Sequence, residues 1–174
     1  MKTLISVLLL LSAPYLFGQT LNDIRSEFSA VVQNPEESRR FYDYLKKIEN
    51  PPSTVKAYQA VSEALLAQVV WNPFNKLAQV MKYDKQMENA VTEDPDNVEI
   101  RFLRLAIEFN LPSFLGMSTH IEEDTQRIIQ NMSSINSMQL DKSYGRYIFH
   151  FLSQSELCTD EEIYLLQRSL SMSQ

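Results

Sequence analysis

One segment near the middle of the chain combines a helix start with a long apolar run. It reads Asp94-Pro95-Asp96-Asn97-Val98-Glu99-Ile100-Arg101-Phe102-Leu103-Arg104-Leu105-Ala106-Ile107-Glu108-Phe109-Asn110. The Asp-Pro pair suits a helix N-terminus, because Asp caps free N–H groups and proline fits the first turn. The apolar residues that follow cover nearly every side, so we expect this helix to lie at the centre of the fold.

The same pattern of a capping residue followed by proline recurs along the chain, at Asn34-Pro35, Asn50-Pro51 and Asn72-Pro73. Beyond residue 18 only Gly116 and Gly145 remain, and no segment shows the alternating pattern of a strand. The sequence therefore predicts an all-α fold of seven to eight antiparallel helices, stacked as hairpins. The predicted helices cover residues 21–33, 35–49, 53–70, 73–93, 96–110, 118–132, 139–154 and 160–172.

Residues 1–18 have the plan of a secretory signal peptide. Lys2 precedes an apolar run from Leu4 to Leu11, and the small residue Gly18 follows. The run is shorter than a bilayer-spanning helix, so we expect no stable membrane insertion. We expect cleavage before Gln19, which leaves residues 19–174 as a single α-helical domain, exported and soluble in the periplasm or outside the cell.

The charge balance narrows the classes of partner. The chain has 16 Lys and Arg residues against 22 Asp and Glu residues, a net charge of −6. An acidic domain repels phosphate backbones and anionic lipids, so neither nucleic acid nor a membrane surface is an expected partner.

A polar stripe interrupts the central helix. Arg101, Arg104 and Glu108 are spaced i, i+3 and i+7 on one face. An arginine removed from water requires carboxylate partners. The next predicted helix begins with three acids that could serve: Glu122, Glu123 and Asp124. These six residues are the candidate site, and three interpretations stay open: a structural ion-pair network, a groove in which the guanidinium groups receive a partner's carboxylate, or exposure to solvent.

Other chemistry has little support. His120 and Asp124 have the spacing of two metal ligands on a helix, but zinc normally takes three or four protein ligands. Motifs of nucleophilic catalysis are missing from the sequence, and Cys158 with His150 is a thiol–imidazole pair in name alone. We therefore expect no catalytic residue, no metal and no cofactor, and we do not expect an enzyme.

Cys158 has a structural explanation. Thr159 and Glu162 predict a capping box at the start of the last helix, with Cys158 packed against Ile163. Packing accounts for this single cysteine better than a reactive thiol does.

Two further features concern packing. The third predicted helix carries a stripe of small residues, Ala57, Ala60, Ala64 and Ala67, which predicts a close helix–helix seam. The connection from Leu111 to Gly116 contains Phe114 and Leu115. We expect these side chains to fold back as a lid over the core, the alternative being an exposed contact patch.

Two resemblances support this picture. Residues 87–97, which include Ala90, Pro95 and Asn97, resemble the end of a tetratricopeptide repeat, although Tyr83 and Trp71 stand where that repeat has small residues. Three segments look like a family of small exported all-helical proteins of the Bacteroidota: Trp71-Asn72-Pro73-Phe74-Asn75-Lys76-Leu77, Asp94-Pro95-x-Asn97-x-Glu99-Ile100-Arg101-Phe102-Leu103-Arg104 and Pro112-Ser113-Phe114-Leu115-Gly116. The resemblances imply stacked helical hairpins and export, and they carry over no catalytic residue.

Together these features predict a non-catalytic exported binding or scaffold module of the bacterial cell envelope, with a protein or peptide partner that the sequence does not identify. The alternative is a periplasmic carrier of a small anionic molecule or peptide, with its groove near Arg101 and Arg104.

Overall fold

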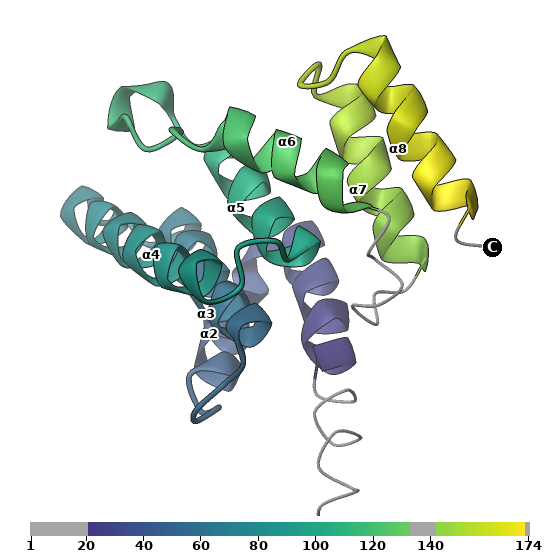
Figure 1. The fold of residues 1–174 in the computed structure, drawn as a ribbon. Coiled ribbons are helices and arrows are strands. Elements are labelled where there is room, and N and C mark those ends of the chain that lie inside the picture. The colour runs from purple at the N-terminus through teal and green to yellow at the C-terminus, as the bar shows by residue number, and fades with distance from the viewer. Residues whose placement is uncertain (1–20, 133–141, 173–174) are drawn as a thin grey trace, which may run out of the picture.

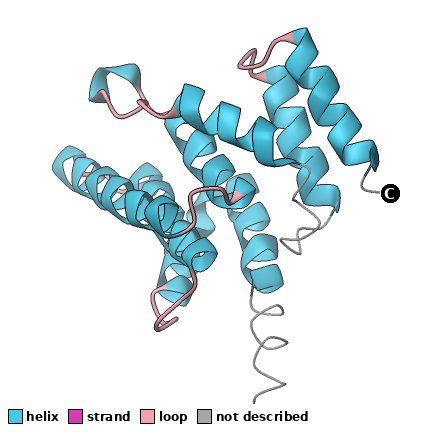
Figure 2. Cartoon of the chain, viewed as in Figure 1, coloured by secondary structure: helices cyan, strands magenta, loops and turns pink. Residues whose placement is uncertain are grey.

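A computed structural model of the 174-residue chain describes residues 21–132 and 142–172 (Figure 1). Within these ranges the chain is all-α and contains no strand, which confirms the predicted class (Figure 2). A helix over residues 21–33 comes first. The elements that follow are η1 (Pro35–Glu37), α2 (Ser38–Leu45), α3 (Ser53–Val69), α4 (Pro73–Glu93), α5 (Val98–Asn110), η2 (Ser113–Leu115), α6 (Ile121–Asn131), α7 (Lys142–Gln154) and α8 (Asp160–Met172). The predicted leader and its cleavage site lie outside the described residues.

Asparagine side chains set two of the helix starts. Asn72 accepts hydrogen bonds from the backbone N–H groups of Phe74 and Asn75, at 2.9 and 3.3 Å, so the predicted start of α4 is confirmed. The start of α5 differs from the prediction. Asn97, and not Asp94, caps the backbone N–H groups at this end, so the helix begins at Val98 and not at residue 96.

Helix α5 lies at the centre of the fold, as its apolar circumference predicts. It passes between α3 and α4 on one side and α6 and α7 on the other (Figure 1). Ile100 and Leu103 join a hydrophobic core formed with the 21–33 helix, α2, α3 and α4. Phe102 and Leu105 join a second core formed with α6, α7 and α8. One helix therefore connects the two hydrophobic cores.

The C-terminal helices pack largely as their sequence indicates. The Phe102 ring meets the rings of Tyr144, Tyr147 and Phe151 edge-on, with centroid distances of 5.3 to 6.1 Å. Tyr147 is nevertheless 49% exposed.

The predicted capping box at the start of α8 is confirmed. Thr159 N–H donates to the Glu162 carboxylate at 2.8 Å, and Glu162 N–H donates to Thr159 Oγ1 at 3.3 Å. Cys158 and Ile163 both pack against the second core. Burial, together with the nearby Glu162 charge, raises the pKa of the Cys158 thiol to about 11, which disfavours the reactive thiolate.

No helix within the described residues has both the length and the apolar character needed to cross a bilayer.

Candidate functional site

The structure brings four of the six candidate residues together between α5 and α6. Arg104 binds Asp124 through two parallel hydrogen bonds of 2.7 Å, Nε to Oδ2 and Nη2 to Oδ1. Arg101 Nη1 donates to Asp124 Oδ1 and to Glu123 Oε1, both at 2.8 Å. The side chains of Arg101 and Arg104 are 3% and 4% exposed, and that of Asp124 is fully buried. The Asp124 carboxylate is thus the shared centre of a buried cluster.

Two further contacts complete this cluster. Arg101 Nε donates to the Pro95 carbonyl oxygen at 2.7 Å, and Arg104 Nη1 donates to the Glu88 carboxylate of α4 at 3.1 Å. Burial alone would lower the pKa of Arg104, but the hydrogen bonds and charge of Asp124 outweigh it and raise that pKa. The hydrogen bond from Arg101 lowers the pKa of Glu123. Both arginines therefore donate hydrogen bonds to groups of the same chain, and together they connect α5 to α4 and α6.

The other two candidate residues lie apart from Asp124. Glu122 is exposed on the surface of α6. Glu108 is buried and accepts two hydrogen bonds from His120, at 2.9 Å from the backbone N–H and at 2.7 Å from Nδ1. Ser118 Oγ also donates to the Glu108 carbonyl oxygen, at 2.7 Å. Glu108 thus secures the far end of the segment 111–120 to α5.

The suggested metal pair is divided between two partners, because His120 binds Glu108 while Asp124 binds the arginines. The described residues contain no group of three or more His, Cys, Asp or Glu side chains that could hold a metal ion.

Sequence reasoning missed a second buried ion pair on α5. Arg25 binds Glu99 through two hydrogen bonds of 2.8 and 2.7 Å, and Tyr58 OH donates to Glu99 Oε1 at 2.7 Å. Glu99 is only 2% exposed. The position of Glu99 within the apolar run could have indicated that it is buried. Acidic residues are also common in the first turn of exposed helices, so the position alone does not predict burial. Burial, together with the neighbouring Tyr144 hydroxyl and Glu99 carboxylate, raises the pKa of Tyr58 well above its usual value.

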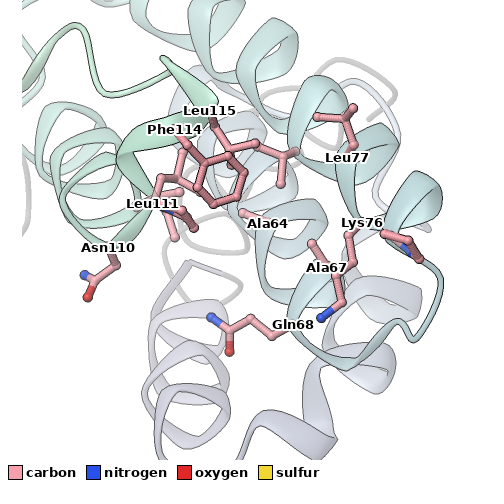
Figure 3. Close-up of a pocket in the computed structure, with 13 residues that line it drawn as sticks. Ala64, Ala67, Gln68, Lys76, Leu77, Asn110, Leu111, Phe114 and Leu115 are labelled. Atoms are coloured by element: carbon pink, nitrogen blue, oxygen red, sulfur yellow. The ribbon is translucent and has the colours of Figure 1, made fainter.

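An apolar groove of about 480 Å³ lies between α3, α4, the end of α5 and the η2 segment (Figure 3). Its floor is formed by Ala64, Ala67 and Val80, each 7% exposed. Figure 3 shows Phe114 and Leu115 near Ala64 at one end of the groove. Lys76 and Gln68 lie toward the other end (Figure 3), and Lys76 is the only charged side chain among the described residues that line the groove.

The alanine stripe of α3 therefore has two environments. Ala57 and Ala60 are fully buried and belong to the first core. Ala64, one turn further on, belongs to the first core and also lines the groove, and Ala67, two turns further on, lines the groove. The predicted close packing is found at Ala57 and Ala60. Toward Ala67 the stripe borders the groove, because a methyl group is too small to fill the space between the helices.

Leu77 and Phe114 line the groove, and two more exposed apolar side chains, Phe74 and Met81, lie at helical spacing from Leu77 on α4. Phe74, Leu77 and Met81, spaced i, i+3 and i+7 on α4, are 81%, 43% and 60% exposed, and Phe114 is 85% exposed. We call these four residues the apolar rim. The expected lid is wrong for Phe114, because the η2 segment turns this ring to solvent beside the groove instead of covering the core. Trp71, just before α4, is 98% exposed.

Comparison with known proteins gives no match to a model of a protein family, to a curated protein or to a solved structure.

Proposed function

We propose that this protein is a non-catalytic binding module, exported to the bacterial cell envelope and built as a tetratricopeptide-like stack of helical hairpins. The observation that carries the proposal is the apolar groove with its exposed rim. Its volume of about 480 Å³ falls in the range of about 300–1,000 Å³ typical of ligand sites.

The rim supports a protein or peptide partner. Exposed large apolar residues that cluster on one surface are typical of interaction sites. Phe114 lines the groove, and Phe74 is exposed on α4 one turn before the lining residue Leu77. Large aromatic side chains are well suited to serve as anchors at a protein interface.

The alternative function, a carrier that receives an anion at Arg101 and Arg104, has less support. Both guanidinium groups are nearly inaccessible and already bind carboxylates of the same chain. A ligand carboxylate would have to displace Asp124, which would then remain buried without its partners.

Site-specific photo-crosslinking in the native host tests the proposal. p-Benzoylphenylalanine is introduced in place of Phe74 or Phe114, with Tyr164 as the control because it is 62% exposed on α8, away from the groove. The proposal predicts the same discrete adduct from positions 74 and 114 and its absence at 164. Equal adduct patterns at all three positions would contradict it.

Export has its own test. The intact mass of protein from the periplasmic fraction should correspond to a chain that begins at Gln19, with or without loss of ammonia by cyclisation of that glutamine. Recovery of the full-length chain from that fraction would contradict removal of the leader.

A further inference from the structure

The groove is deep because Ala64 and Ala67 have no side-chain atoms beyond Cβ. Ala64 and Ala67 of α3 face Leu77 and Val80 of α4 in the groove lining, and Ile107 and Leu111 complete it from the α5 side. An apolar hollow of this kind is poorly hydrated and favours an apolar ligand.

One cation lies in this apolar surrounding. Lys76 is exposed on α4 and makes no ion pair within the described residues. The two amide side chains of the lining are Gln68 and Asn110, and Asn110 Nδ2 already donates to the Ala106 carbonyl oxygen at 2.8 Å. The position of this ammonium group at the edge of an apolar groove suits a ligand whose apolar chain ends in an anionic group.

We propose that the groove binds a single-chain amphiphile with a carboxylate headgroup, its hydrocarbon chain on the floor formed by Ala64 and Ala67 and its carboxylate at Lys76. This inference rests on the proposed role of the groove as the binding site and goes beyond it by naming a ligand class. The ammonium group neutralises the headgroup, and its three N–H donors match carboxylate oxygens. The apolar rim remains available to a protein partner while the floor is occupied.

Isothermal titration of the purified mature chain with decanoate, below its micelle concentration, tests this assignment. Decanol and decyltrimethylammonium carry the same chain with a neutral and a cationic headgroup. We expect one decanoate per chain, bound about tenfold more tightly than decanol, and weaker binding of the cation. Affinity should rise by roughly fourfold for each added methylene from octanoate to decanoate, as burial of hydrocarbon predicts.

Two variants and one control locate the ligand. Lys76→Gln should bring decanoate to the affinity of decanol, whereas Lys85→Gln, exposed on α4 outside the groove lining, should leave both unchanged. Ala67→Leu should fill the floor of the groove and lower the affinity for decanoate and for decanol at least tenfold. Circular dichroism confirms that each variant keeps its helical content.

The outcomes separate this inference from the proposed function. Equal binding of decanoate and decanol, both lost in Ala67→Leu, overturns the carboxylate assignment but leaves the groove as an apolar binding site. Binding that Ala67→Leu does not change places the amphiphile elsewhere and overturns the inference. Failure of every amphiphile to bind, with the crosslinks at positions 74 and 114 retained, also overturns it and leaves a partner chain as the occupant of the groove.

Discussion

Asp124 of α6 accepts two parallel hydrogen bonds of 2.7 Å from Arg104 of α5, and neither side chain is accessible to solvent by more than 4%. The same carboxylate also accepts from Arg101 at 2.8 Å. A single buried carboxylate therefore pairs with two buried guanidinium groups. The half-exposed Glu123 and the exposed Glu88 supply further negative charge to the two arginines.

Asp124→Asn should destabilise the fold by about 3–5 kcal/mol, because it leaves two buried guanidinium groups without their shared charge. The matched control is Glu122→Gln, two residues away and exposed, which should change the unfolding free energy by about 0.5 kcal/mol or less. Urea denaturation followed by circular dichroism measures both. Similar free energies for the two variants would show that the cluster does not stabilise the fold.

Ala60→Leu should cost about 1–3 kcal/mol, because Ala60 is fully buried in the seam and a larger side chain overpacks it. Ala67→Leu makes the same chemical change on the same helix, but the added atoms enter the groove. We expect its cost to be about 0.5 kcal/mol or less. Denaturation curves that give equal costs would place both alanines in one packing environment and argue against the hollow.

Acid should weaken the contact between Arg101 and Glu123. The folded-state pKa of Glu123 lies below its ordinary value of 4.5, so folding favours the ionised carboxylate. Its contribution is complete above about pH 4.5 and is lost as the pH falls through the lower folded-state value. Urea denaturation should therefore show that the difference in unfolding free energy between wild type and Glu123→Gln shrinks below pH 4.5. A difference that grows in acid would contradict this assignment.

The Cys158 thiol should react slowly with iodoacetamide at pH 7, because burial and the Glu162 charge raise its pKa to about 11. Mass spectrometry of the folded protein should show alkylation that accelerates as the pH approaches that value, and fast alkylation after denaturation. Rapid labelling of the folded chain at neutral pH would instead indicate an activated thiol.

Much of the helical architecture could be predicted from local signals. Asn72-Pro73 marks the start of α4, and the apolar circumference of residues 98–109 indicates a central position. The start of α5 was displaced because two residues near it, Asp94 and Asn97, can each cap a helix, and sequence alone does not rank them.

The groove could not be predicted, because it depends on where helices diverge. Ala60 and Ala67 belong to the same stripe of small residues, yet Ala60 is fully buried in the first core and Ala67 lines the groove. The pairing of Arg25 with Glu99 was missed for a similar reason, since it joins residues 74 positions apart. Contacts of this kind are set by tertiary packing rather than by local pattern.

We infer that the groove, and not the arginine cluster, is the binding site. Methyl NMR of alanine-labelled protein titrated with decanol tests it most directly, because this neutral probe reports on the groove without involving a headgroup charge. We expect chemical-shift changes at Ala64 and Ala67, with the buried methyl groups of Ala57 and Ala60 unchanged. Changes confined to other alanines, with Ala64 and Ala67 unmoved, would contradict it.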